Sequence, residues 1–186
     1  MRHRLLGMLF AMLAGAACAD GSVALAELAV PGRVLVLRHA SAPGFGDPPE
    51  FRIDDCGTQR NLDEGGRAQA GTLGARLRAA GIHRARVFSS QWCRCLETAR
   101  LLDIGPVEAL PALNSFYQRS DQRQDRLQAL RAFLADQPVD GPPLVLVTHQ
   151  VTISALTDRA TPSGGGSLFA LNGTDEPRWL GVIAPP

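Results

Sequence analysis

The chain contains no lysine, so all 19 of its basic residues are arginines. This absence excludes P-loop nucleotide hydrolases, Schiff-base enzymes and enzymes with a lysine general base. Any anion site must therefore be built from guanidinium groups, which bind phosphate and carboxylate oxygens in pairs. The 18 acidic residues nearly balance the arginines. The chain thus lacks the positive excess typical of proteins that bind nucleic acid, and we expect no nucleic-acid partner.

The chain also lacks an internal linker, a repeat and any low-complexity stretch. With 186 residues, of which 45% are hydrophobic and 20% charged, it has the composition of an ordinary globular protein with a substantial core. We therefore expect a single domain over residues 27–186.

The first 26 residues are predicted to be a signal peptide. A short basic segment precedes an apolar stretch at 5–17, and small residues follow, with cleavage after Ala19 or Ala26. The apolar stretch is too short for a stable transmembrane helix, so no membrane span is expected after processing. These features predict an exported, periplasmic protein. A lipoprotein anchored at Cys18 is the weaker alternative.

Two continuous apolar runs, Val34–Leu37 and Leu144–Val147, are typical of strands covered on both faces. Segments with helical periodicity alternate along the chain with these two runs and with shorter predicted strands. Neighbouring parallel strands need helical connections of this kind. The sequence therefore predicts an α/β fold: three layers, with a mainly parallel, doubly wound sheet and helices on both faces. Further strands are expected at 86–89, 107–110, 167–171 and 178–183, the last two at sheet edges. Helices are expected at 63–80 and 125–135, and a third is expected to begin after Ser90, which would cap it.

Both apolar runs end in polar residues that could form a site. Arg38 and His39 follow the first run, and Thr148 and His149 follow the second. Open α/β sheets bind ligands at the carboxyl ends of their strands. One histidine at a strand end is more often a structural residue than a catalyst. Two at the same edge favour a shared site.

Arg94 lies in the first turn of the helix expected after Ser90, where the helix dipole already makes the surroundings positive. A bound anion would relieve this conflict, and tetrahedral phosphate suits paired arginines. The alternative is an exposed Arg94 paired with Glu97 or Asp63. A metal site on two histidines is disfavoured because nearby guanidinium groups would repel a cation. A serine triad is disfavoured because no Gly-x-Ser-x-Gly sequence is present.

Three cysteines remain after removal of the leader: Cys56, Cys93 and Cys95. Because an exported protein can form disulfides, we hypothesise a bond from Cys56 to Cys93 or Cys95. Such a bond would join the long irregular loop at 40–60 to a helix. The alternative is three buried thiols.

Four segments, taken in order, resemble the signatures of the histidine phosphatase superfamily, in its phosphoglycerate-mutase-like branch (branch 1). They are Leu37-Arg38-His39-Ala40; Asn61-Leu62-Asp63-Glu64-Gly65 with Gln69-Ala70; Ser89-Ser90 followed by Arg94 and Glu97-Thr98-Ala99; and Val147-Thr148-His149. The resemblance extends over roughly residues 33–183. It implies the phosphoglycerate-mutase-like version of the predicted fold.

The resemblance also implies roles for four residues. His39 would be the nucleophile that is phosphorylated, Arg38 and Arg94 would hold the phosphoryl oxygens, and His149 would stabilise the group in transfer. It implies a phosphoric monoester hydrolase that acts on a phosphate monoester or phosphoramidate of a small compound, without a metal or other cofactor. The alternative is a periplasmic relative that binds a phosphorylated ligand with little or no turnover.

The sequence departs from the family's pattern at the proton donor. Ser115 follows Leu113 and Asn114, where the branch commonly has a glutamate, and Gln150 follows His149, where the other large branch has an acid. The donor is therefore unassigned. Three explanations remain open: a carboxylate from the 40–60 loop, a substrate with a good leaving group, or binding without turnover. The loop carboxylates are Asp47, Glu50, Asp54 and Asp55, each of which could equally be a solvated turn residue.

Overall fold

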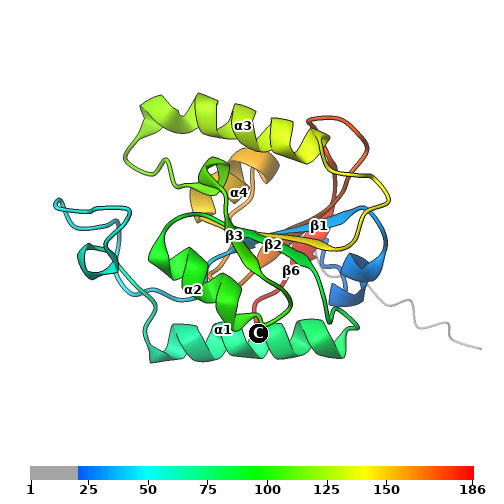
Figure 1. The fold of residues 1–186 in the computed structure, drawn as a ribbon, viewed down its shortest axis with the longest axis horizontal. Coiled ribbons are helices and arrows are strands. Elements are labelled where there is room, and N and C mark those ends of the chain that lie inside the picture. The colour runs from blue at the N-terminus through cyan, green and yellow to red at the C-terminus, as the bar shows by residue number, and fades with distance from the viewer. Residues whose placement is uncertain (1–20) are drawn as a thin grey trace, which may run out of the picture.

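The computed structural model describes residues 21–186, which form a three-layer α/β fold. A six-stranded sheet lies between α1 and α2 on one face and α3 and α4 on the other (Figure 1). The strands are β1 (Arg33–Arg38), β2 (Arg86–Ser89), β3 (Val107–Ala109), β4 (Leu144–Thr148), β5 (Gly166–Ala170) and β6 (Arg178–Ile183), and the helices are α1 (Glu64–Ala79), α2 (Cys93–Leu101), α3 (Arg123–Ala135) and α4 (Gln150–Thr157). No helix within 21–186 has the length and hydropathy to cross a membrane.

The strand order is β3-β2-β4-β1-β5-β6. β3, β2, β4 and β1 pair in parallel, whereas β5 is antiparallel to both of its neighbours. The prediction of a mainly parallel sheet with helices on both faces is therefore confirmed. The prediction of an edge strand at 167–171 is wrong, because β5 lies inside the sheet and all five of its residues are buried.

The two central strands place alternate residues on opposite faces of the sheet, as the period of two in a strand requires. In β1, Leu35 and Leu37 pack into the core under α1 and α2, and Val34 and Val36 pack into the core under α3 and α4. All four are fully buried. A run of apolar residues is needed here because neither face of the strand meets solvent.

The helix predicted at 63–80 is α1, whose first turn is capped by the Asp63 carboxylate, which accepts from the backbone N–H of Gly66 at 2.7 Å. A Cβ at Gly66 would overlap the backbone carbonyl of Ser41. The missing side chain thus lets the start of α1 lie directly against the chain that leaves β1.

The expected cap at Ser90 is wrong. α2 begins after Trp92, whose side chain makes no capping bond, and the Ser90 hydroxyl lies instead against His149. α4, which follows His149 directly, was not predicted. Its eight residues are too few to show a helical period.

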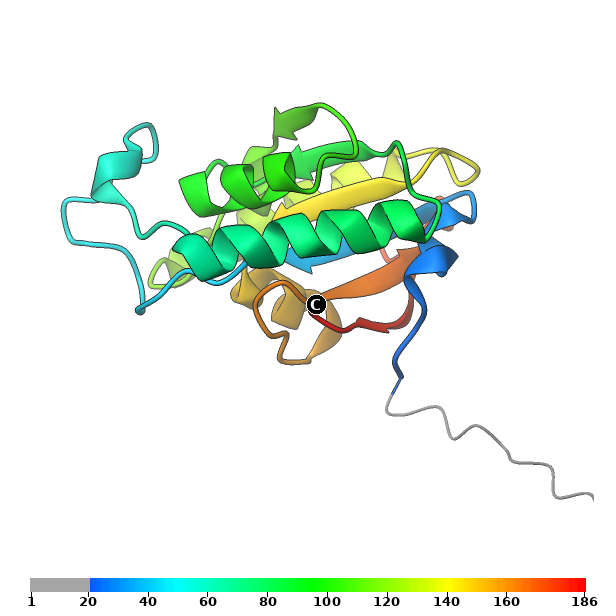
Figure 2. The ribbon, with the colours of Figure 1, turned by 90° about the horizontal axis from the view of Figure 1, so that it is seen from below.

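The loop between β1 and α1 contains one short 3-10 helix, η2 (Cys56–Thr58), and projects beyond the end of the sheet (Figure 2). A disulfide joins Cys56 to Cys93 at the start of α2. The predicted signal peptide falls largely outside the described residues. Of its last residues, Gly21 and Val23 exchange backbone hydrogen bonds with Val182 of β6.

Candidate active site

The strand ends converge on one cavity of about 570 Å³ at the carboxyl edge of the sheet. His39 follows β1 and His149 follows β4, and their ring centroids lie 5.5 Å apart. Arg38 and Arg94 line the same cavity. The structure thus brings together the four residues that the sequence singled out for catalysis and phosphate binding.

One nitrogen of His39 is held by the backbone. Nδ1 lies 2.7 Å from the carbonyl oxygen of Ala40. Because a carbonyl oxygen can only accept, Nδ1 must carry the proton in this contact, and Nε2 carries the lone pair. The backbone N–H of Ala40 in turn donates to the hydroxyl of Thr98 in α2. The orientation of His39 is therefore fixed by its own strand end and by α2.

His149 is held from the α2 side of the cavity. Its Nε2 lies 2.9 Å from the Ser90 hydroxyl and 3.5 Å from the sulfur of Cys95. The indole ring of Trp92 meets the His149 ring edge to face, with centroids 5.3 Å apart. These contacts leave Nδ1 without a partner among residues 21–186.

Both histidines are neutral over the physiological pH range. Burial, followed by the charge of Arg94, lowers the pKa of His39 to about 3, and the hydrogen bond to Ala40 only partly opposes this shift. Burial and then the neighbouring His39 lower the pKa of His149 well below its ordinary value. A neutral His39 with a free Nε2 lone pair is the form that can attack phosphorus.

Arg38 reaches across the sheet end to the segment after α4. Its Nη1 donates to the backbone carbonyl of Thr161 at 2.8 Å and to the side chain of Gln150 at 3.3 Å. Burial and the charge of Arg94 lower the pKa of Arg38. Two guanidinium groups that disfavour each other's charge create a site that a bound anion would stabilise.

Arg94 is almost fully buried and forms a bidentate ion pair with Asp47. Nη1 donates to one carboxylate oxygen at 2.8 Å, and Nη2 donates to the other at 3.2 Å. The exposed pair with Glu97 or Asp63 is therefore not formed; Glu97 lies near Arg67 instead. The Nε atoms of Arg94 and Arg38 are buried and have no hydrogen-bond partner among the described residues.

Asp47 is the candidate acid that lines the cavity; Glu50, Asp54 and Asp55 do not. Besides Arg94, its carboxylate accepts from the indole N–H of Trp92 at 2.9 Å and the backbone N–H of Arg60 at 3.0 Å. Burial raises its pKa, but these hydrogen bonds outweigh burial and the net pKa is lowered. With both oxygens occupied and the charge stabilised, Asp47 is a positioning residue rather than a proton donor.

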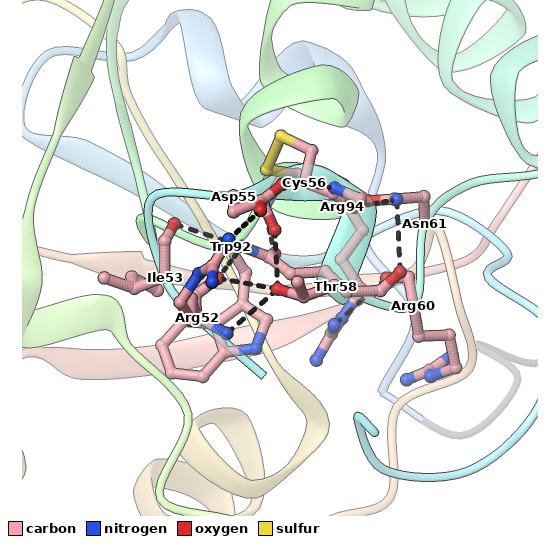
Figure 3. The surroundings of a disulfide bond; sticks show 12 residues. Arg52, Ile53, Asp55, Cys56, Thr58, Arg60, Asn61, Trp92 and Arg94 are labelled. Atoms are coloured by element: carbon pink, nitrogen blue, oxygen red, sulfur yellow. Dashed lines mark hydrogen bonds and ion pairs between the residues drawn. A yellow bond between two sulfur atoms is a disulfide. The ribbon is translucent and has the colours of Figure 1, made fainter. Parts of the chain in front are cut away.

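The disulfide holds the loop against the start of α2. Figure 3 shows Trp92, Arg94 and Arg60 around the bond between Cys56 and Cys93. The backbone N–H of Cys93 also donates to the side chain of the buried Gln59 at 2.9 Å. The loop's position therefore determines where the partner of Arg94 lies.

Among residues 21–186 the remaining thiol is that of Cys95, which is buried in the core. Burial raises its pKa to about 12, so it stays protonated beside His149. It is thus a packing residue of the site rather than a nucleophile.

Sequence reasoning missed Arg60 and the cavity role of Trp92. Arg60 donates through Nε to the carbonyl of Gly46 at 2.9 Å and through Nη1 to that of Ala42. It therefore braces the loop that carries Asp47. No periodic signal marks a residue in an irregular loop, and Trp92 lies just before the first residue of α2, where helical periodicity gives no signal either.

The described residues offer no metal site. Nowhere within 21–186 do three or more His, Cys, Asp or Glu side chains gather closely enough to hold an ion. The cavity instead collects guanidinium groups and neutral imidazoles, which suit an anionic ligand.

The chain is similar to known proteins in sequence and in fold. Residues 34–118 match the family model of the histidine phosphatase superfamily (branch 1). No curated protein matches the chain. The protein histidine phosphatase SixA complexed with tungstate shares the fold with a TM-score of 0.58 at 18% identity, over 82% of this chain and 97% of that one.

Two further solved structures are similar over most of their length. SixA from Agrobacterium tumefaciens has a TM-score of 0.55 at 22% identity, over 84% of this chain and 99% of that one. A mycobacterial glucosyl-3-phosphoglycerate phosphatase in complex with inorganic phosphate has a TM-score of 0.57 at 15% identity, over 83% of this chain and 97% of that one. At these identities the likeness shows a common fold.

Proposed function

Since residues 34–118 match the family model of the histidine phosphatase superfamily (branch 1), we propose that the chain is a phosphatase of small phosphorylated compounds that acts through a phosphohistidine on His39. The observation that carries this proposal is the state and place of His39: a neutral imidazole with Nε2 free, in a cavity that Arg38 and Arg94 also line. Nucleophile and anion site thus occur together.

In the proposed first step, Nε2 of His39 attacks phosphorus and forms a P–N bond. The bond from phosphorus to the leaving group breaks, and the leaving group takes its electron pair. Arg38 and Arg94 hold the phosphoryl oxygens, and His149 lies beside the group in transfer. Phosphoryl transfer gains most of its acceleration from positioning and charge stabilisation of this kind.

In the second step, water attacks the phosphorus of phosphohistidine. The P–N bond breaks, its electron pair returns to Nε2, inorganic phosphate leaves, and the proton of the water passes to solvent. His39 is then neutral again. Its hydrogen bond to Ala40 keeps the same nitrogen available for the next turnover.

The leaving group must depart without help from a carboxylic acid of the cavity. Asp47 is the one carboxylate among the described cavity residues, and its hydrogen bonds keep it ionised. General acid catalysis is worth about 10² to 10⁴ in rate. We therefore propose substrates with good leaving groups, such as phosphoramidates or aryl and acyl phosphates, ahead of simple alkyl esters.

We propose further that the protein is exported to the periplasm. The basic and apolar leader supports export, and a disulfide suits an oxidising compartment. The pairing of Gly21 and Val23 with β6 supports cleavage after Ala19, because cleavage after Ala26 would remove these contacts. Mass spectrometry of the mature N-terminus tests the site.

The test of the phosphatase proposal uses mature protein and 4-nitrophenyl phosphate. We expect hydrolysis that EDTA does not reduce, an acid-labile phosphoenzyme, and loss of at least about 10³-fold in kcat/KM for His39→Ala. His83→Ala is the matched control, because His83 is exposed and outside the cavity. Activity that survives His39→Ala would overturn the mechanism.

The alternative function is a phosphate-ligand binder with little turnover, and the saturated carboxylate of Asp47 is the observation that favours it. A binder would retain phosphate affinity by calorimetry but hydrolyse neither aryl phosphates nor phosphoramidates. Turnover of either class would reject it.

A further inference from the structure

Four arginines line the cavity, and three of them are already engaged. Arg94 is paired with Asp47, and Arg38 and Arg60 donate to backbone carbonyls. Arg119, the fourth, is exposed, and its guanidinium makes no hydrogen bond or ion pair with any residue in the described part of the chain. Its N–H donors therefore remain available to a ligand.

Arg119 is nevertheless held in place. Its guanidinium lies over the ring of Phe51, 5.9 Å from the centroid. Phe51 stacks on Trp92 with centroids 5.0 Å apart, and Trp92 meets His149. Two rings, those of Phe51 and Trp92, thus lie between Arg119 and the imidazole of His149. A cation–π contact orients the guanidinium without using its in-plane donors.

The charge and size of the cavity both exceed what a phosphoryl group needs. Four guanidinium groups face one carboxylate, Asp47, so a phosphoryl dianion would leave positive charge unbalanced. The volume of about 570 Å³ lies in the range of sites that hold a small organic molecule. The unbalanced charge resides on Arg119, because the other three guanidinium groups lie around the phosphoryl position or its supporting loop.

We propose that Arg119 forms a second anion subsite, which makes the natural substrate a phosphorylated compound whose leaving group carries its own carboxylate or phosphate. This inference rests on the proposed phosphatase function and specifies its substrate class. Arg119 is then a specificity-determining residue: it contributes to substrate affinity and leaves the chemistry at His39 unchanged.

The test compares three aryl phosphates with the same nitrophenolate leaving group: one unsubstituted, one with a ring carboxylate and one with a second ring phosphate. In the wild type we expect kcat/KM for at least one anionic substrate to exceed that for the unsubstituted one by about tenfold, through KM, as one charged hydrogen bond allows. Arg119→Gln should abolish this preference and leave the unsubstituted substrate unchanged. The substrate whose kcat/KM falls in Arg119→Gln identifies the anion that the subsite binds.

Arg84→Gln is the matched control, because Arg84 is exposed, outside the cavity, and has no ion pair among residues 21–186. Arg119→Lys should retain part of the preference, which rising salt should weaken. Equal losses on all three substrates in Arg119→Gln, or no preference in the wild type, would overturn the subsite. If the wild type hydrolyses none of them, the phosphatase proposal fails. Calorimetric binding of the same compounds to wild type and Arg119→Gln then decides the subsite separately.

Discussion

The cavity has two walls of different construction. His39 and His149 lie directly at the ends of β1 and β4, on backbone that is paired on both sides. The opposite wall, with Asp47 and Phe51, is an irregular loop held by a disulfide, an ion pair and the contacts of Arg60. The strand wall carries the proposed chemistry, whereas the loop wall sets the charge and shape that a substrate meets.

Arg94 connects the loop wall to α2, because it lies in α2 and pairs with the loop's carboxylate. α2 in turn holds the strand wall, since its Thr98 accepts from the backbone N–H of Ala40. This difference in construction indicates how such a site can change specificity without losing its nucleophile. Loop residues can vary while the strand ends remain as they are.

Among the changes that test the difference between the walls, Asp47→Ala should have the largest effect, because it breaks this ion pair. Removal of one partner from a buried ion pair should cost about 3–5 kcal/mol of stability, and a displaced Arg94 should lower kcat/KM about 10²-fold. Urea unfolding and steady-state kinetics measure the two effects. Asp55→Ala is the control, since Asp55 pairs with Arg52 on the exposed surface. A rise in kcat/KM would mean instead that Asp47 competes with phosphate for Arg94.

The second prediction loosens the loop wall alone. Cys56→Ser with Cys93→Ser should lower the free energy of unfolding by about 4 kcal/mol, since the bond closes a long loop at a sequence separation of 37. KM should rise several-fold, whereas kcat should change little because the histidines stay on the strands. Denaturant titration and kinetics test both. A fall in kcat with KM unchanged would mean that the loop contributes to the chemistry.

The third prediction concerns the strand wall and pH. The unfolded chain takes up protons on its histidines as pH falls below about 6.5, whereas folded His39, with its pKa at about 3, does not. The free energy of unfolding should therefore be greatest above pH 6.5 and decline as pH falls toward 3. His39→Gln should reduce the slope by up to about 1.4 kcal/mol per pH unit. Denaturant titration across this range measures it, and an unchanged slope would contradict the neutral buried imidazole.

The smallest effect is expected outside both walls. Glu97 in α2 lies 3.6 Å from Arg67, and both side chains are substantially exposed. Glu97→Gln should change stability by less than about 1 kcal/mol and leave kcat/KM unaltered, because solvent screens such pairs. Thermal unfolding and the same assay check this. A marked loss of activity would place Glu97 in the site despite its exposure.

Much of the fold and of the strand wall could be predicted, because local patterns encode them. The runs at Val34–Leu37 and Leu144–Val147 are continuous and apolar, so they predict doubly covered strands, and the residues that follow them must meet at one edge. Helix α4 and the interior place of β5 could not be predicted. Eight residues show no period, and the position of a strand in a sheet depends on long-range pairing.

The sequence by itself determined that two histidines and two arginines lie at one edge of the sheet, because the order of strands and helices places them there. It also determined that no lysine can take part in the site. Only the tertiary structure decided which partners they meet. Cys93 rather than Cys95 bonds Cys56, because residues two apart on a helix point in nearly opposite directions. Asp47 rather than Glu97 pairs with Arg94, because the path of an irregular loop, 47 residues away in sequence, is set by packing and not by periodicity.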